Sequence, residues 1–167
     1  MKIFLIGPMG SGKSKIGRIL SEKLSISLFD IDKEIEKDLN MSITEIFASK
    51  GEIFFRNTET DYLIKTKGLR DCIVSTGGGV VEEIKNLEFL RKEAKVVFLN
   101  CSVESQYENT KNSAKRPLLL PKDPKLTLQT LYEKRFDSYK KVSKLELLSD
   151  SMSNDEIANK IINHFNV

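Results

Sequence analysis

The sequence has few of the residues on which several common kinds of functional site depend. Its 167 residues include one histidine, two cysteines and no tryptophan. His164 stands three residues from the last residue, which argues strongly against a nucleophile activated by histidine and against a histidine-rich metal site. Cys72 and Cys101 are 29 residues apart and form no CxxC pair. A redox dithiol or a zinc ribbon is therefore excluded.

Long hydrophobic runs and a strong charge of one sign are also missing. No apolar run approaches the roughly 18 residues of a membrane span, and no signal-peptide pattern precedes Lys2. We therefore expect a cytoplasmic protein with no membrane partner. We also expect a monomer. The net charge is +3, and aromatic residues do not alternate with basic ones, so we expect no nucleic-acid partner. A mild positive balance suits a protein that binds small anions in one cleft.

Strand and helix patterns alternate along the whole chain. Short apolar runs predict five strands, at 2–6, 27–29, 72–75, 95–99 and 145–148. Amphipathic spacing predicts helices between them, at about 13–24, 33–39, 43–66, 82–93, 102–109, 126–141 and 155–165. This alternation predicts an α/β fold, with a parallel sheet covered on both faces. Ligands of such sheets bind beyond the carboxyl ends of the strands.

We expect residues 1–167 to form a single domain, because a chain of this length buries roughly 70% of its unfolded surface. Two regions depart from the alternation. Residues 33–67 form a long, charged helical insertion, in which Ser42 and Glu45 are spaced as a capping box and Gly51 interrupts the helix. Residues 110–125 are basic and contain three of the four prolines, which is typical of a mobile flap.

A phosphate-binding loop is the most specific motif in the chain. Residues 7–14, GPMGSGKS, fit GxxxxGK[ST], follow a predicted strand and precede a predicted helix. In such loops the backbone N–H groups surround phosphate oxygens, and the helix N-terminus adds positive potential. The spacing assigns Lys13 to the β- and γ-phosphates of a nucleoside triphosphate and the Ser14 hydroxyl to Mg²⁺. An ordinary glycine-rich turn is the alternative.

Two carboxylates follow the second predicted strand. Strand alternation places Asp30 and Asp32 on the same side of its end, next to the phosphate-binding loop. One carboxylate is then suited to ordering the water shell of Mg²⁺ and the other to orienting or deprotonating an attacking hydroxyl. The alternative is that they cap the following helix.

A glycine-rich turn and three arginines complete the candidate site. Gly77, Gly78 and Gly79 follow the third strand and allow a ligand to approach the backbone closely. Arg135 lies on the apolar stripe of its helix and therefore needs a carboxylate, from either the protein or a ligand. Arg56 is similar, with Glu59 one turn later, and Arg116 in the flap is placed to clamp a phosphoryl group. Snorkelling side chains, internal ion pairs and a solvated loop charge are the alternatives.

In these motifs the chain resembles the shikimate kinase family over essentially its whole length. The resemblance rests on residues 7–14, the Asp30-x-Asp32 pair, GEIFFRNTE at 51–59, TGGG at 76–79, RPLL at 116–119, and Arg135 with Tyr139. It implies a nucleoside-monophosphate-kinase-like, three-layer fold with a five-stranded parallel sheet in the order 2-3-1-4-5. It also implies transfer of the γ-phosphoryl group of Mg·ATP to the 3-hydroxyl of shikimate, on the route to chorismate and aromatic amino acids.

The resemblance also implies a role for each matching residue. Phosphate binding falls to Gly10, Ser11, Gly12, Lys13 and Ser14, with Mg²⁺ held by Ser14 and Asp30. Shikimate binding falls to Asp32, Arg56, Gly77, Gly78, Gly79 and Arg135, with shikimate bound by an insertion at about 33–67. Asp32 is the candidate base, and Arg116 closes onto the phosphates from a lid at about 110–125.

One position departs from the pattern of the family. Seven residues before the lid arginine the family usually has another arginine, which stacks on adenine, and here that residue is Asn109. Lys111 supplies a charge near the nucleotide but no planar stacking group, and we include it among the nucleotide-binding candidates.

Four other functions are alternatives to a shikimate kinase activity. A gluconate kinase is not excluded by composition, and motif spacing argues against it. A nucleotide kinase needs a second basic or aromatic constellation that the sequence does not offer beyond Arg56 and Arg135. A regulatory GTPase needs an Asn-Lys-x-Asp motif, and the fourth strand is followed by Asn100, Cys101 and Ser102 instead. A non-catalytic nucleotide-binding module is expected to lose Asp32 or Arg116, and both are present.

Overall fold

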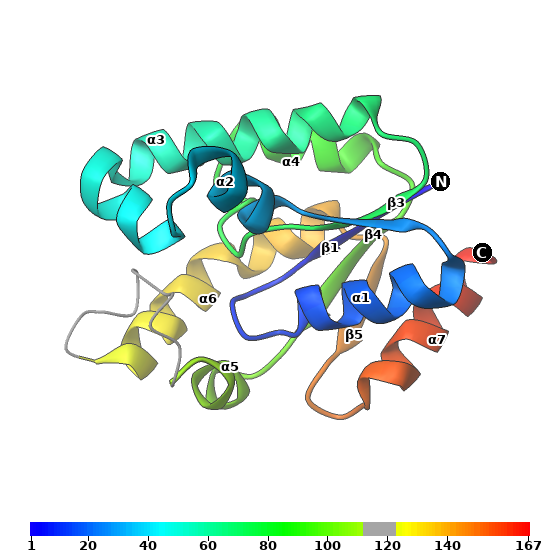
Figure 1. Cartoon of the computed structure of the whole chain (residues 1–167). Coiled ribbons are helices and arrows are strands. Elements are labelled where there is room, and N and C mark those ends of the chain that lie inside the picture. Colours follow the sequence, from blue (N-terminus) through cyan, green and yellow to red (C-terminus); the bar gives the residue numbers. More distant parts are fainter. Residues whose placement is uncertain (112–122) are drawn as a thin grey trace.

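The computed structural model describes residues 1–111 and 123–167, and within these residues it contains one five-stranded parallel sheet (Figure 1). The strands are β1 (Lys2–Ile6), β2 (Ser27–Asp30), β3 (Cys72–Ser75), β4 (Val96–Asn100) and β5 (Leu145–Leu148). Their order across the sheet is β2-β3-β1-β4-β5, and each neighbouring pair is parallel. The predicted α/β fold and the strand order implied by the family resemblance are both confirmed.

The central strand shows why the strands read as short apolar runs. Ile3, Phe4, Leu5 and Ile6 of β1 are all fully buried, because helices cover both faces of the sheet. Phe4 and Ile6 belong to the apolar core on one face, and Ile3 and Leu5 to the core on the other. The twofold alternation of side chains therefore divides one strand between two cores.

Helices on the two faces come from different parts of the chain. Helices α1 (Lys13–Leu24) and α7 (Asn154–Phe165) pack side by side on one face. The other face is covered by α4 (Ile84–Lys92), α6 (Pro124–Val142) and the insertion formed by α2 (Ile31–Leu39) and α3 (Ile43–Lys65). A 3-10 turn (Thr66–Gly68) follows α3, and α5 (Val103–Thr110) packs against α6.

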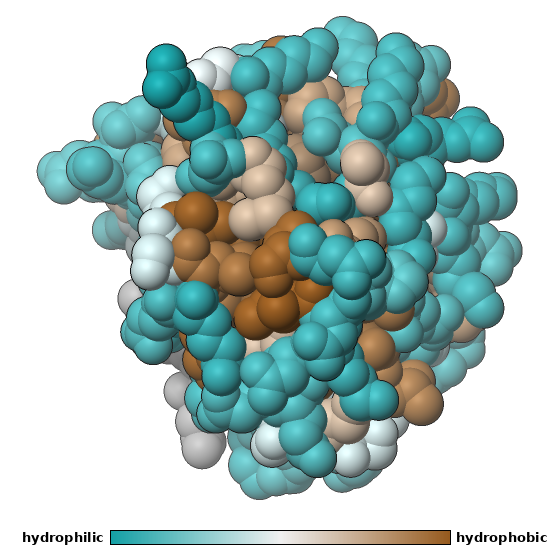
Figure 2. Space-filling view, turned by 90° about the vertical axis from the view of Figure 1, so that its right-hand side faces the viewer, coloured by the Kyte–Doolittle hydropathy of each residue, from teal (hydrophilic) through white to brown (hydrophobic). Residues whose placement is uncertain are grey.

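The parallel strands give the molecule two different edges. The strands begin near the two chain termini, on the right in Figure 1. Figure 2 shows that edge face on, with hydrophilic side chains around one apolar area. The strands end at the opposite edge, where the phosphate-binding loop and the turn after β3 meet.

The end of β2 differs from the expectation. Helix α2 begins at Ile31 rather than at residue 33, so Asp32 lies in its first turn and not on an extended strand. The reason is a helix cap, because the Asp30 carboxylate accepts a hydrogen bond from the Lys33 N–H at 3.5 Å. The strand alternation that placed Asp30 and Asp32 on one side was therefore the wrong argument. The capping alternative holds for Asp30.

Helix α3 begins and bends where its sequence indicates. Ser42 and Glu45 form the predicted capping box, with the Glu45 carboxylate 2.7 Å from the Ser42 backbone N–H. Gly51 interrupts the helix with φ 83° and ψ 166°, a conformation that residues with a side chain rarely adopt. This kink sets the direction of the second half of α3, which carries Arg56 and Glu59.

Among the residues that the structure describes, no helix is both long and apolar enough to cross a membrane.

The kink at Gly51 gives a test with a matched control. A Cβ added at Gly51 or at Gly68 meets no atom within 4 Å, but only Gly51 has a positive φ. We expect Gly51→Ala to lower the free energy of unfolding by about 1–3 kcal/mol, because the backbone must hold a disfavoured conformation. Gly68→Ala should leave it within about 1 kcal/mol. Urea unfolding of the three proteins measures both values, and equal midpoints would show that Gly51 is not strained.

Candidate active site

The phosphate-binding loop connects β1 to α1 in a conformation that depends on glycine. Gly10 and Gly12 have φ angles of 81° and 87°. A Cβ at Gly7 would lie 2.3 Å from the Leu99 backbone oxygen, so the loop lies directly against the end of β4. Gly12 precedes α1 and has no side chain to cap it, which leaves the first N–H groups of the helix available to an anion.

Lys13 places a buried positive charge in this loop. Its side chain is 8% exposed, and its Nζ donates to the backbone oxygens of Gly7 at 2.8 Å and Pro8 at 2.7 Å. The ammonium group therefore lies within the turn that the loop makes, next to the N-terminus of α1. The positive charge of the ammonium group and the dipole of α1 both attract an anion such as a phosphate group.

Ser14 joins the loop to the end of β2. Its hydroxyl donates to the Asp30 carboxylate at 2.6 Å and lies 3.4 Å from the Ser75 hydroxyl at the end of β3. Hydroxyl and carboxylate oxygens are hard donors of the kind that Mg²⁺ uses while it keeps several waters. The described residues contain no cluster of three or more acidic, histidine or cysteine side chains that would form a full metal cage. Ser14 and Asp30 therefore fit a magnesium ion bound mainly through its nucleotide.

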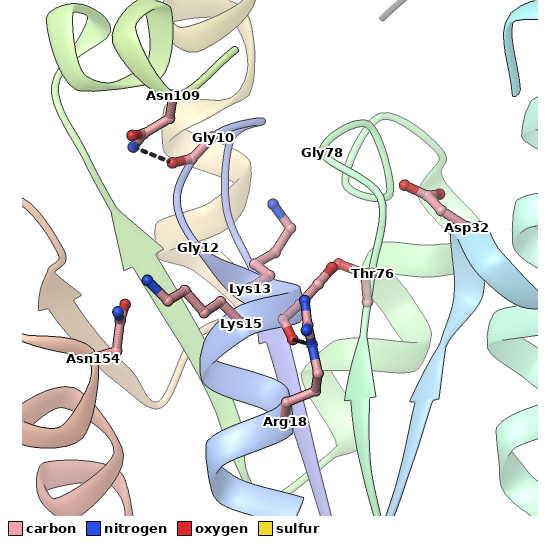
Figure 3. A pocket seen from close by; sticks show the side chains of 11 residues that line it. Gly10, Gly12, Lys13, Lys15, Arg18, Asp32, Thr76, Gly78, Asn109 and Asn154 are labelled. Atoms are coloured by element: carbon pink, nitrogen blue, oxygen red, sulfur yellow. Dashed lines mark hydrogen bonds between the residues drawn. The ribbon is translucent and has the colours of Figure 1, made fainter. Parts of the chain in front are cut away.

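A pocket of about 570 Å³ opens beside the loop (Figure 3). Lys15, Arg18 and Asn154 lie on one side of it, and Asp32 with the turn after β3 lies on the other. Asn109 from α5 also lines it, and its amide donates to the Gly10 oxygen at 2.9 Å. Basic side chains and the Asp32 carboxylate thus line the same pocket, together with Lys13.

The glycine-rich turn after β3 separates the loop from a group of buried charges. A Cβ at Gly77 would lie 2.2 Å from Glu59 Oε1 and 2.9 Å from Asp32 Oδ1. A Cβ at Gly79 would lie 2.2 Å from Arg56 Nη1, and one at Gly78 would lie 3.2 Å from the Met9 nitrogen. These glycines are needed because charged side chains and the phosphate-binding loop approach the turn from both sides.

Arg56 and Glu59 form a buried ion pair on α3. Glu59 is fully buried, Arg56 is 7% exposed, and Arg56 Nη1 lies 2.8 Å from Glu59 Oε2. Arg56 also contacts Glu52 at 3.2 Å. Burial raises the pKa of Glu59 to about 7, with the positive charge of Arg56 acting against this and the negative charge of Asp32 adding to it. Glu59 therefore titrates near neutral pH, beside the candidate base.

Arg135 on α6 meets a carboxylate of the protein. It is 3% exposed, and its Nε and Nη2 lie 2.9 and 2.5 Å from Glu82 Oε1. The same oxygen is 3.9 Å from Arg56 Nη2, so Glu82 connects the two arginines. Tyr139, one turn after Arg135, donates its hydroxyl to the Gly78 oxygen and fixes the turn to α6. The internal ion pair that the sequence left open is thus present.

Glu82, which contacts both buried arginines, was not among the residues singled out from the sequence. It lies just past the glycine-rich turn, at the edge of the sheet where ligands bind. A carboxylate in that position was a signal, but its partners are on α3 and α6, far away in the sequence. Lys15, Arg18 and Asn154 were also not proposed, although they line the pocket.

One of the predicted nucleotide-binding residues lies apart from this geometry, and another is not described. Lys111 follows α5 and pairs with Glu108 at 2.5 Å, and it is not among the residues that line the pocket. Arg116 falls within 112–122, outside the described residues. The remaining candidates lie at the loop, at Asp30 and Asp32, in the glycine-rich turn, and at the two buried arginines.

Fold and site together define a class of protein. A GxxxxGKS loop after the central strand binds nucleotide phosphates, and a separate group of charges lies across the glycine-rich turn from it. This arrangement is that of a P-loop kinase that binds a small acceptor molecule next to its nucleotide.

Comparison with known proteins defines the family. The family model for shikimate kinase matches residues 9–166, and the chain belongs to this family. A shikimate kinase of Marinomonas sp. (strain MWYL1) is 41% identical over 162 residues, which cover 96% of this chain and 89% of that protein. The chain is accordingly an ATP-dependent kinase.

Solved structures agree with this assignment. A structure of shikimate kinase from Acinetobacter baumannii in complex with shikimate has a TM-score of 0.95 at 34% identity, and the match covers 98% of this chain and 92% of that one. A deoxyadenosine kinase from M. mycoides with bound dATP has a TM-score of 0.65 at 18% identity, and it covers all of both chains. The second likeness concerns the fold alone.

The raised pKa of Glu59 predicts how stability depends on pH. Between about 4.5, the ordinary value, and about 7, the folded protein binds more protons at Glu59 than the unfolded chain does. The free energy of unfolding should therefore fall as pH rises through this window. Gln at position 59 does not titrate, so the free energy of unfolding of Glu59→Gln should lack this fall. From pH 5 to pH 8 it should therefore rise relative to that of the wild type by on the order of 1–3 kcal/mol. Urea unfolding at both pH values measures this difference, and an equal pH dependence of the two proteins would contradict it.

Proposed function

We propose that this chain transfers the γ-phosphoryl group of ATP to the 3-hydroxyl of shikimate. One observation supports the proposal most directly. Arg56 is buried against Gly79 of the glycine-rich turn, and buried Arg135 is connected to it through Glu82. Asp32 lies near Gly77, and the phosphate-binding loop approaches the turn at Gly78. A small acid with several hydroxyls matches this set, because its carboxylate pairs with guanidinium groups and its hydroxyls with a carboxylate.

In this proposal the loop holds the phosphates. The N–H groups of Gly10, Ser11 and Gly12 and the ammonium of Lys13 surround the β- and γ-phosphate oxygens. Lys13 gives up its contacts with the carbonyls of Gly7 and Pro8 in favour of the more strongly charged ligand. Lys15 and Arg18, which line the pocket, add positive potential near the phosphates.

Mg²⁺ belongs to the same proposal. Ser14 would hold it directly, and Asp30 would order its water shell and keep the Ser14 hydroxyl in place. When bound, the ion neutralises charge that develops on the transferring phosphoryl group.

Asp32 is assigned to the acceptor. It lines the pocket in the first turn of α2, near Gly77. Its negative charge acts on the neighbouring Glu59 and helps to raise the pKa of that residue. From there its carboxylate would accept a hydrogen bond from the attacking hydroxyl and take up its proton as the bond to phosphorus forms.

Several assignments rest on the family resemblance. These are the closing of Arg116 and a lid at about 110–125 over the phosphates, a contribution of Lys111 to nucleotide binding, and the use of residues 33–67 to bind shikimate. The monomeric state and the cytoplasmic location likewise stay predictions from the sequence.

A substrate panel tests the proposed activity. Without an acceptor, ADP release from Mg·ATP measures hydrolysis by water. We expect shikimate to raise ADP release well above this background rate, and gluconate and nucleoside monophosphates to leave it near the background. A coupled assay measures ADP, and labelled ATP shows whether phosphate reaches the acceptor. A rate with gluconate or a nucleoside monophosphate that matches the rate with shikimate would contradict the proposal.

The role of Asp32 gives a second test. Asp32→Asn should lower kcat by roughly 10²–10⁴-fold, because the amide cannot take up the proton of the hydroxyl. ATP affinity, measured by calorimetry, should change little. Asp61→Asn, an equivalent change at an exposed position of α3, is the control and should behave as the wild type does. Normal turnover in Asp32→Asn would remove this residue from catalysis.

A further inference from the structure

Glu82 occupies the position between the two arginines that a ligand carboxylate would take. Its Oε1 is 2.9 Å from Arg135 Nε, 2.5 Å from Arg135 Nη2 and 3.9 Å from Arg56 Nη2. The arginine side chains are nearly buried, and the Glu82 side chain is 16% exposed. One carboxylate oxygen is therefore the close partner of Arg135 and a more distant partner of Arg56, which also has Glu59 and Glu52.

The second oxygen of Glu82 points to a different partner. Oε2 is paired with Lys134 Nζ, and the Lys134 side chain is 61% exposed. Lys134 precedes Arg135 on α6, and successive residues of a helix do not share a face. Glu82 is thus held between an exposed cation and two buried ones.

The backbone of Glu82 belongs to the turn that faces the site. Its N–H donates to the Gly79 oxygen at 2.9 Å, which holds the main chain in place. The side chain can then rotate between its partners without a change in the backbone. Although burial acts in the opposite direction, the hydrogen bond from Lys134 and the charge of Arg135 keep the pKa of Glu82 below its ordinary value. The side chain is therefore negatively charged at neutral pH.

We propose that Glu82 is a built-in competitor for the substrate carboxylate, which pairs with Arg135 and Arg56 in the free enzyme and withdraws to Lys134 when the substrate binds. This inference rests on the proposed function. Arg56 keeps Glu59 and Glu52 as partners throughout, so Arg135 carries most of the exchange. The two buried cations are paired with carboxylate both before and after binding.

A competing carboxylate also makes the site selective. An acceptor with a carboxylate replaces the charge that it displaces, whereas a neutral acceptor of the same shape leaves Glu82 paired with the arginines and in its way. Discrimination then comes from a repulsive element as well as from attraction to the arginines. Glu82 is accordingly a specificity-determining residue and not a catalytic one.

The change in shikimate affinity caused by Glu82→Gln distinguishes a competing carboxylate from one that only positions the arginines. We expect Glu82→Gln to bind shikimate roughly 3- to 10-fold more tightly in calorimetry without nucleotide, because the competing charge is gone. If Glu82 only holds the arginines in position, the same change weakens binding. Glu83→Gln, the same substitution one residue later on an exposed side chain, is the control and should keep the wild-type affinity.

Two further measurements identify the cause of the change. The methyl ester of shikimate carries no charge, so it should bind the wild type more weakly than shikimate does, and it should regain affinity in Glu82→Gln, where the obstructing charge is gone. Lys134→Gln should weaken shikimate binding in the wild-type background, because Glu82 loses its second partner, and should have a much smaller effect together with Glu82→Gln. An effect of Lys134→Gln that is equal in both backgrounds would overturn the exchange.

The outcomes keep this inference apart from the proposed function. If the wild type binds no shikimate, the proposed function fails. If the wild type binds it and Glu82→Gln binds it equally well or less tightly, the function stands and the inference is overturned. Glu82→Asp is the second variant in case Glu82→Gln does not fold. Its shorter side chain reaches the arginines less closely, so it should also bind shikimate more tightly than the wild type.

Discussion

The burial of two guanidinium groups at the carboxyl edge of the sheet is the constraint on which the site depends. A buried arginine without a carboxylate is strongly unfavourable, because its charge loses the solvation of water. The chain meets this demand with Glu59 and Glu82, which approach from α3 and from the turn after β3. The two arginines are therefore held in place by carboxylates of the protein itself.

The glycine-rich turn follows from the same constraint. Charged side chains can be buried together only if the backbone between them occupies little space. Gly77 and Gly79 leave no Cβ where Glu59 and Arg56 approach, and the hydroxyl of Tyr139 fixes the turn from α6. The turn in this way keeps the acceptor side and the phosphate side at a fixed separation, which phosphoryl transfer requires because its catalysis consists mainly of positioning.

Local patterns in the sequence predicted the elements of the fold well, and the partners of the buried charges less well. The loop at 7–14, the five strands, the capping box at Ser42 and the break at Gly51 each depend on neighbours within a few residues. Asp32 was placed on a strand because strand alternation was preferred to the capping alternative, which the structure shows at Asp30. Glu82 was missed because its partner Arg135 is 53 residues away, and only the packing of α6 against the sheet brings them together.

Asn109 takes part in the contact between α5 and the phosphate-binding loop. Asn109 stands where the family usually has an arginine that stacks on adenine, and its amide instead donates to the Gly10 oxygen. Gly10 is enclosed further by α5, since a Cβ there would lie 3.0 Å from the Gln106 oxygen and 3.2 Å from Thr110 Cγ2. Helix α5 therefore supports the phosphate-binding loop with neutral contacts. The positive charge in the described pocket lies with Lys13, Lys15 and Arg18, at and next to the phosphate-binding loop.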